Sequence, residues 1–211
     1  SVSGPKTDFK DATNIAELLR IGLFERDYHL RSYVASPPLR ALRHQTRRRN
    51  RLVRRQTDEK NALRKYLLQC NLKGPRTIDA PSLARWLSAQ EHKLPEHTAA
   101  TAWDIADQLA VFERQQARIE RTIAKRVRDL QPWKRLFEIL DSLPGVGDIV
   151  AWTLIAEIED FTRFDRAEQL VNYVGLDPRV FQSDKTVRHG KVAKQGPRDA
   201  RWALQQAAWV A

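Results

Sequence analysis

The sequence is poor in cysteine, in methionine and in the residues that interrupt helices. Cys70 is the single cysteine among 211 residues, which excludes an internal disulfide framework or a zinc site built on several cysteines and fits a reducing compartment. Glycine and proline number only 8 and 10, so long stretches contain nothing that would break a helix. The chain begins at Ser1 and contains no methionine, from which we expect that further residues precede it.

Long apolar runs are also missing. The longest, over 149–155, is broken only by Thr153 and is far shorter than the roughly 20 residues of a membrane-spanning helix. We also expect no signal peptide. The sequence therefore predicts a cytoplasmic protein without a membrane partner, and its 42% of hydrophobic residues are enough to build a buried core.

Acidic residues are scarce relative to basic ones. There are 26 aspartates and glutamates against 37 lysines and arginines, which gives a net charge of +11. Such an excess repels itself in a compact chain unless a polyanion binds, and nucleic acid is the commonest polyanion. Taken by itself, the charge would also suit an acidic membrane surface, so it predicts a polyanionic partner without naming it.

The hydrophobic periodicity is that of helices, and strand-like alternation is weak. Ser36-Pro37-Pro38 is a helix start signal, and Gly74-Pro75 is expected to end the long helix that follows. We predict a mainly α fold, with helices over 8–24, 37–70, 81–90, 96–130 and 198–211.

One of these helices carries an apolar seam with the three- and four-residue steps of a coiled coil. Its members are Ala102, Ile105, Leu109, Phe112, Gln116, Ile119, Ile123, Val127 and Leu130. The seam predicts either a dimerising or antiparallel coiled-coil-like arm, or an ordinary amphipathic helix packed on the preceding one. We divide the chain into 1–36, a helical arm over 37–135, and a compact C-terminal helical domain over 136–211.

Arginines are concentrated at the start of that arm. Eight arginines and no acid occur over 40–55, several of them on one flank of the predicted helix. The arginine fork donates two hydrogen bonds to one phosphate, which suits a nucleic-acid backbone. The alternative is a solvated charged face. The candidate ligands are Arg40, Arg43, Arg47, Arg48, Arg51, Arg54 and Arg55.

The segment Pro144-Gly145-Val146-Gly147 has the form of a helix-hairpin-helix turn. Gly145 and Gly147 would let the backbone turn tightly and bring its amides close to a phosphate at the start of the next helix. The alternative is a corner used only for packing, which Asp148 favours because its carboxylate competes for the same amides.

A serine lies near the C-terminal end among basic residues. Ser183 could attack a phosphodiester if cations neutralised the developing charge and a base took its proton. From spacing alone, an ordinary loop hydroxyl is the favoured interpretation. Ser142 is expected to act only in the turn after its helix. The basic residues around Ser183 are Lys185, Arg188, Lys191, Lys194, Arg198 and Arg201.

Taken in order, these motifs resemble the IS110/IS116/IS902 family of transposases over almost the whole chain. The C-terminal part of the resemblance rests on Leu143-Pro144-Gly145-Val146-Gly147, Ala156-Glu157-Ile158, Phe164, Tyr173-Val174-Gly175-Leu176-Asp177-Pro178, Ser183, Gly190, Lys194, Gly196, Arg201 and Ala207-Ala208. The N-terminal part rests on 4–12, which is similar to the end of the family's RuvC-like domain, on Ala16, Leu18-Leu19 and Gly22-Leu23, and on the arginine-rich helix with Glu59-Lys60-Asn61.

The resemblance implies a site-specific recombinase of a prokaryotic insertion sequence, associated with the nucleoid and working as a dimer or tetramer. It implies that a structured guide RNA pairs with DNA, and that Ser183 is the nucleophile. It also implies that Asp8 and Asp11 hold Mg²⁺ together with two further acids of the RuvC-like domain. From the residues alone, helix capping is the favoured role for both. The first two acids are absent from this chain, so we expect it to be inactive by itself, and Asp184 departs from the glycine of many relatives.

Overall fold

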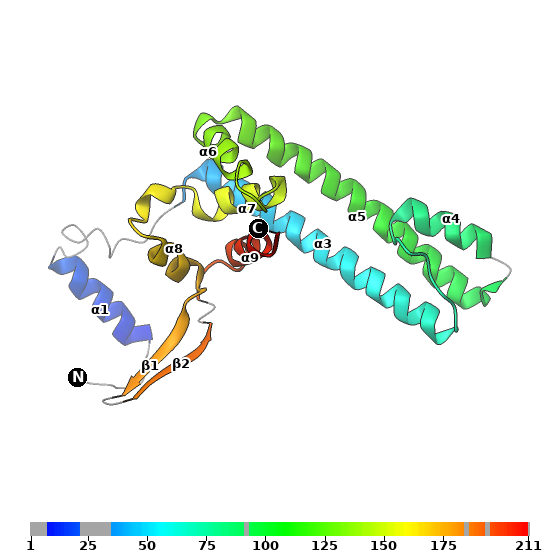
Figure 1. Cartoon of the computed structure of the whole chain (residues 1–211), viewed down its shortest axis with the longest axis horizontal. Coiled ribbons are helices and arrows are strands. Elements are labelled where there is room, and N and C mark those ends of the chain that lie inside the picture. The colour runs from blue at the N-terminus through cyan, green and yellow to red at the C-terminus, as the bar shows by residue number, and fades with distance from the viewer. Residues whose placement is uncertain (1–7, 22–34, 91–92, 184–185, 193–194, 211) are drawn as a thin grey trace. The chain divides into compact units, whose positions relative to one another are not determined.

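A computed structural model describes residues 8–21, 35–90, 93–183, 186–192 and 195–210 (Figure 1). The chain divides into two compact units, 1–36 and 37–211. The predicted division of the second unit near residue 136 stays a prediction. No helix among the described residues is long and apolar enough to cross a membrane.

In the first unit, the helix α1 spans Asp8–Arg20. It begins where the sequence predicts, and its predicted end at Phe24 lies outside the described residues. Glu17 pairs with Arg20 one turn later, at 2.6 Å between Oε1 and Nη2, but both side chains are exposed. Ile15 and Leu19 are also exposed.

The second unit begins with the helix α3, which spans Pro37–Gln69. Proline is tolerated here because the first turn of a helix has no amide partner to lose. The helix ends earlier than Gly74-Pro75, because Asn71 takes a left-handed conformation with φ 54° and the Leu72 amide turns back to the Leu67 carbonyl. Asparagine tolerates this conformation better than most residues, so the turn at Asn71 ends the helix.

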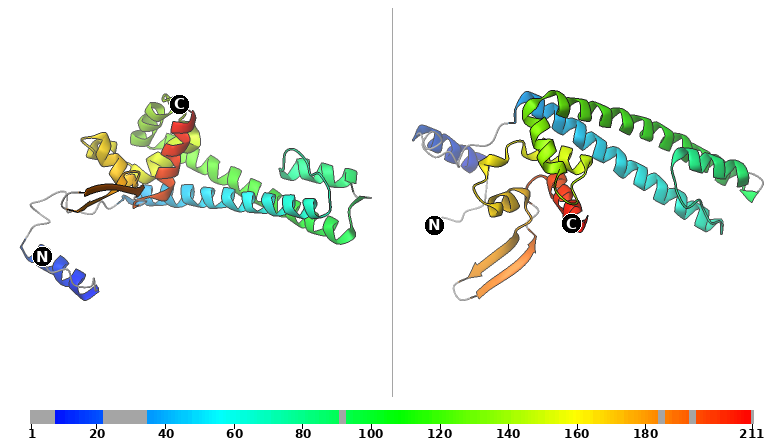
Figure 2. Two further views of the ribbon diagram at one scale, coloured as in Figure 1. Left: turned by 60° about the horizontal axis from the view of Figure 1, so that its bottom comes forward. Right: turned by 45° about the horizontal axis from the view of Figure 1, so that its top comes forward.

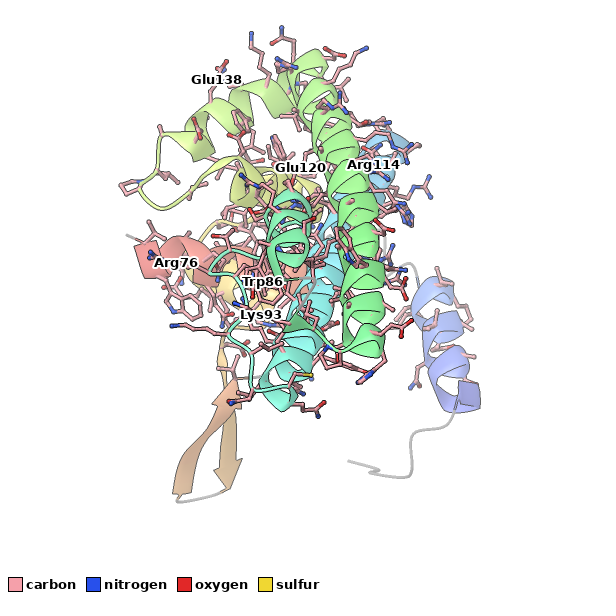
Figure 3. All side chains as sticks on the ribbon, turned by 90° about the vertical axis from the view of Figure 1, so that its right-hand side faces the viewer. Arg76, Trp86, Lys93, Arg114, Glu120 and Glu138 are labelled. Carbon is pink, nitrogen blue, oxygen red and sulfur yellow. The ribbon has the colours of Figure 1, made fainter. Side chains whose placement is uncertain are left out.

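The helix α4 (Ala80–Gln90) packs against the helix α5 (Glu96–Asp129) and shares a buried apolar cluster with the end of α3. Asp79 precedes α4 and accepts hydrogen bonds from the Ser82 amide at 2.8 Å and the Ser82 hydroxyl at 3.0 Å. These bonds hold the pKa of the Asp79 carboxyl below its usual value. The Trp86 side chain packs against a buried apolar cluster at this end (Figure 3). The cluster comprises Leu63, Leu67, Ile78, Ala80, Leu83, Leu87, Leu94, Ala102, Ile105, Ala106 and Leu109.

The helices α3 and α5 run side by side along the arm (Figures 1 and 2). Six of the nine predicted seam residues of α5 are buried: Ala102, Ile105, Leu109, Ile119, Ile123 and Val127. Gln116 is half-buried, and its Oε1 accepts a hydrogen bond of 2.8 Å from Nε2 of the buried Gln56 in α3. The seam is therefore covered within the chain, as an antiparallel pair or an amphipathic helix would require.

Beyond the arm lie the helices α6 (Gln131–Asp141), α7 (Asp148–Ile158), α8 (Ala167–Val174) and α9 (Arg198–Val210), with a short 3₁₀ turn, η3 (Phe161–Arg163). The helix α7 is buried on all sides from Val150 to Ile158, as its almost uninterrupted apolar sequence requires. It contacts α3, α5, α6 and α9, so it is the central element of this region.

Two strands lie between α8 and α9, where the weak alternation of the sequence does not predict them. The strands β1 (Pro178–Ser183) and β2 (Thr186–Val192) form an antiparallel hairpin, in which Phe181 pairs with Arg188 and Ser183 with Thr186. The pairing shifts between Pro178 and Val180. Val180, Phe181 and Val187 favour strands, but the interspersed charged residues and Gly190 hide the alternation from a periodicity search. The mainly helical fold is confirmed, with this hairpin as an addition.

Candidate nucleic-acid interface

Four of the predicted arginine ligands form one exposed face on α3. Arg40, Arg48, Arg51 and Arg55 are exposed, and none forms a hydrogen bond or ion pair through its guanidinium within the part of the chain that the structure describes. At 3.6 residues per turn they lie within an arc of about 80°. His44 lies in the same arc and is also exposed. We call the four arginines the arginine stripe.

Two other predicted ligands point into the protein instead. Arg47 donates from Nε and Nη2 to the two carboxylate oxygens of Glu157 in α7, both at 2.8 Å. Arg43 donates to the backbone carbonyls of Ala156 at 2.9 Å and Glu157 at 3.3 Å, and its Nε lies 3.7 Å from the Glu157 carboxylate. The Glu157 side chain is only 1% exposed. Arg43 and Arg47 thus satisfy a buried carboxylate and join α3 to α7.

This pairing also affects the protonation of the arginine. The hydrogen bonds to Glu157 raise the pKa of the Arg47 guanidinium above its ordinary value, because they stabilise its charged form. A buried carboxylate that loses its cation strongly destabilises a protein. The folded state is therefore stable only when α3 and α7 are packed so that Arg47 reaches Glu157. Glu157 is the one acid in the apolar stretch 149–158, and a lone acid there is the sequence signal that could have revealed a buried ion pair.

Arg49 and Arg54 are paired as well. Arg49 binds Glu120 of α5, which is labelled in Figure 3, at 2.8 Å, and Arg54 binds Asp199 at the start of α9 at 2.9 Å. The Arg54 side chain remains 45% exposed. Four of the eight arginines over 40–55 therefore hold α3 against its neighbours, and the arginine stripe is the part left facing solvent.

The predicted Pro144-Gly145-Val146-Gly147 turn lies between α6 and α7, and its identity as a helix-hairpin-helix stays a prediction. The Ser142 hydroxyl donates to the Ile139 carbonyl at 2.7 Å, and the Val146 amide donates to the Leu143 carbonyl at 3.1 Å. Gly145 has φ 79°, a conformation that favours glycine. Gly147 precedes α7 with φ −95°, and a Cβ there would meet open space, so the backbone does not need glycine at this position.

The start of α7 has no side-chain cap among the described residues. Its first helical residue, Asp148, is exposed. Uncapped amides at a helix start are suited to an anion. Phosphate binding by the backbone at Gly145 and Gly147 remains a prediction.

The β1–β2 hairpin has a narrow base. Gly175 ends α8 with φ 70°, and a Cβ there would collide with the Gln195 carbonyl. Gly196 has φ 114°, and a Cβ there would collide with the Tyr173 carbonyl. Arg201 of α9 donates to the Val174 carbonyl at 2.6 Å. We call residues 173–176 and 195–196, together with Arg201, the neck of the hairpin.

Ser183 lies at the end of the hairpin away from the neck, as the last residue of β1. Its side chain and those of Arg188 and Lys191 are outside the description, and Lys185 and Lys194 lie outside the described residues altogether. Arg198, the first residue of α9, is exposed. Arg201 is also a predicted nucleic-acid ligand, and among the described residues its guanidinium donates to the Val174 carbonyl.

The two predicted metal ligands lie in the first unit. Asp8 and Asp11 both fall in the first turn of α1, three residues apart, and their side chains are outside the description. Two carboxylates supply only part of the six oxygen ligands that Mg²⁺ takes. Elsewhere in the described residues, no group of three or more His, Cys, Asp or Glu side chains could hold a metal ion. The residues that the structure describes therefore do not make up a complete metal site.

Sequence comparison gives the same family at both ends of the chain. Residues 137–211 match the family model described as Transposase IS116/IS110/IS902 family, and residues 1–72 match the model of the DEDD transposases of IS110. A probable family 20 transposase of Pseudomonas aeruginosa is 28% identical over 92% of this chain and 56% of its own length. The putative transposase y4qE of Sinorhizobium fredii is 27% identical over 97% of this chain and 48% of its own length.

The transposase for insertion sequence element IS1328 of Yersinia enterocolitica is 25% identical over 77% of this chain and 47% of its own length. The chain therefore spans about half the length of these curated relatives. The two family models together match most of the chain. The N-terminal match includes the arginine-bearing helix α3, and the C-terminal match includes the hairpin. The chain belongs to the IS116/IS110/IS902 family of transposases.

Proposed function

We propose that the protein containing this chain is the transposase of an insertion sequence, which cuts and rejoins DNA strands through Ser183. The match of both ends of the chain to models of one transposase family is the observation that carries the proposal. The arginine stripe supports it, because four exposed arginines on one face of a helix supply the cations that a sugar-phosphate backbone requires.

In this proposal the stripe holds nucleic acid by its phosphates. From Arg40 to Arg55 the helix rises about 22 Å, enough to follow several consecutive phosphates. Contacts of this kind carry no sequence information, so the protein needs another source of specificity. A structured RNA that pairs with DNA would provide it, and the stripe is equally suited to that RNA.

The chemical step assigned to Ser183 is a transesterification. The serine oxygen attacks the phosphorus of one phosphodiester, forms a new P–O bond and loses its proton to a base. The bond from phosphorus to one sugar oxygen breaks, and that oxygen takes a proton. Since one phosphate ester replaces another, the bond energy is kept for rejoining in the reverse sense. Cations beside the phosphate stabilise the charge that develops.

Asp8 and Asp11 are proposed as two ligands of a divalent metal ion, with the remaining ligands supplied by other acids of the complete protein. When bound, such an ion would neutralise phosphate charge at the reacting bond. We propose assembly as a homo-oligomer, because the exchange of strands between two duplexes requires more than one nucleophile.

The proposal is tested in the full-length protein with a DNA substrate nicked close to the cleavage point, which traps a covalent protein–DNA adduct. We expect Ser183→Ala to abolish the adduct while nucleic-acid binding persists. Ser142→Ala is the matched control, since that hydroxyl only bonds the Ile139 carbonyl in an exposed turn. If Ser183→Ala still gives the adduct, Ser183 is not the nucleophile. If neither wild-type nor variant protein gives one, the protein is a non-catalytic binding module.

The guide RNA is tested separately, by purifying the full-length protein and sequencing the RNA bound to it. A single RNA species encoded by the same DNA element would support guidance by base pairing. A random sample of cellular RNA would contradict it and leave the stripe as a non-specific contact.

A further inference from the structure

A continuous set of contacts connects the helix of the arginine stripe with the neck of the hairpin. It begins in α3, where Arg43 and Arg47 hold Glu157 of α7. It continues to α8, where the Tyr173 hydroxyl donates to the Glu157 carbonyl at 3.1 Å. That carbonyl therefore accepts hydrogen bonds from both α3 and α8.

Tyr173 is itself part of the neck. Its backbone carbonyl lies so close to Gly196 that no Cβ fits there, and the next residue but one, Gly175, is equally close to Gln195. The strand β1 begins at Pro178, soon after Gly175, and β2 ends at Val192, shortly before Gly196. Both ends of the hairpin are thus set by the position of Tyr173 and its neighbours.

The ring of Tyr173 is held independently of its hydroxyl. The ring packs at 5.4 Å from the ring of Phe164, and the Arg163 guanidinium lies 4.4 Å above it. Removal of the hydroxyl alone would keep these contacts while releasing the hydrogen bond to Glu157. Tyr173→Phe therefore tests the effect of the hydroxyl on the position of the neck while the ring contacts that stabilise the fold remain.

We propose that Tyr173 is a positioning residue: its hydroxyl, bonded to the Glu157 carbonyl, fixes the hairpin neck relative to α3. The inference rests on the proposed role of Ser183, which stands at the other end of the hairpin. A nucleophile must meet the phosphorus of a strand that other residues hold, and a misplacement of about 1 Å costs on the order of a hundredfold in rate. Tyr173 touches no reacting atom and acts through the neck.

The experiment compares three variants of the full-length protein: Tyr173→Phe, Tyr66→Phe and Ser183→Ala. Tyr66 lies on α3 with its side chain exposed, so Tyr66→Phe is a control for the loss of a phenol hydroxyl. Each protein is measured for adduct formation in single-turnover conditions, for the Kd of the same DNA and for its melting temperature. The three readouts separate chemistry, binding and folding.

We expect Tyr173→Phe to lower the single-turnover rate by on the order of tenfold, with Kd and melting temperature within error of the wild type. Tyr66→Phe should match the wild type in all three measurements. If Tyr173→Phe reacts at the rate of Tyr66→Phe, the inference is overturned while the proposed function stands. If DNA affinity or melting temperature falls in parallel with the rate, the residue is merely structural and the inference is overturned as well. Adduct formation by Ser183→Ala would overturn the proposed function and the inference together.

Discussion

Arg47 and Glu157 form a two-pronged ion pair, with both nitrogen–oxygen distances at 2.8 Å, between a half-exposed guanidinium and a carboxylate that is 1% exposed. The arginine belongs to the segment with the highest positive charge, yet it acts within the fold. Arg48, the next residue along the chain, is exposed and belongs to the stripe. Adjacent arginines thus have different tasks, and this difference can be measured.

Arg47→Ala should destabilise the protein far more than Arg48→Ala. Loss of one partner of a buried pair costs about 3–5 kcal/mol, and we expect about 2–3 kcal/mol here because Arg47 is partly solvated and Arg43 remains near the carboxylate. Arg48→Ala should change stability by less than about 0.5 kcal/mol. Urea unfolding of the two variants makes the comparison, and equal midpoints would contradict the structural role of Arg47.

The stripe should reveal itself in the salt dependence of nucleic-acid binding. For duplex DNA, each phosphate that the protein no longer neutralises reduces the slope of log K against log salt by about 0.9. Replacement of Arg48 and Arg51 by alanine should therefore lower the slope by roughly 2 and weaken binding for all sequences alike. Replacement of Arg118 and Arg121, two exposed arginines of α5, is the charge-matched control. A slope unchanged by the substitutions in α3 would remove the stripe from the interface.

Replacement of glycine by alanine should destabilise the fold at Gly175 and Gly196 in the neck, but not at Gly147 before α7. Gly175→Ala and Gly196→Ala each force a Cβ against backbone in a left-handed conformation, which we expect to cost more than about 1 kcal/mol. At Gly147 the added methyl meets open space and φ is −95°, so Gly147→Ala should fold with wild-type stability. If Gly147→Ala also keeps full affinity for nucleic acid, the turn before α7 is a packing corner and no phosphate site.

The Asp79 carboxyl should make the arm less stable in acid. Its hydrogen bonds to Ser82 lower its pKa from the ordinary value of 3.8, so the folded state favours the charged form. The contribution is complete above pH 3.8 and is lost as the pH falls through the lower, folded-state pKa. Asp79→Ala should cost about 1 kcal/mol near neutral pH, as for other helix caps, and the difference from wild type should shrink in acid. Urea midpoints measured from pH 7 downward make the test, with a pH-independent difference as the contrary result.

Local signals in the sequence predict most of the helical framework. The start of α3 at Pro37 and the end of α4 at Gln90 follow from proline placement and periodicity, and they are confirmed. The helix α4 begins one residue before the predicted Pro81, and six of the nine predicted seam residues of α5 are buried. The hairpin is not predicted, because its strands are short and charged residues interrupt their alternation. Strand pairing depends on a partner across the turn, which periodicity within one strand does not reveal.

The division of the arginines could not be predicted for a related reason. Helical spacing places Arg43, Arg47 and Arg54 near the stripe, and nothing in that spacing tells which of them meets a carboxylate. Their partners are far away along the chain, because Glu157 lies 110 positions after Arg47 and Asp199 lies 145 positions after Arg54. The pairing therefore depends on tertiary packing. The roles of Ser183, Asp8 and Asp11 stay predictions.

Gly175 and Gln195 are in close contact, so the segment between them begins and ends at almost the same point of the helical domain. An insertion or a replacement within this segment does not change the distance between its two ends. Grafting the corresponding stretch from a relative, cut at Gly175 and Gly196, should therefore give a folded chimera. Such chimeras would allow the hairpin that is proposed to carry the nucleophile to be exchanged between members of the family.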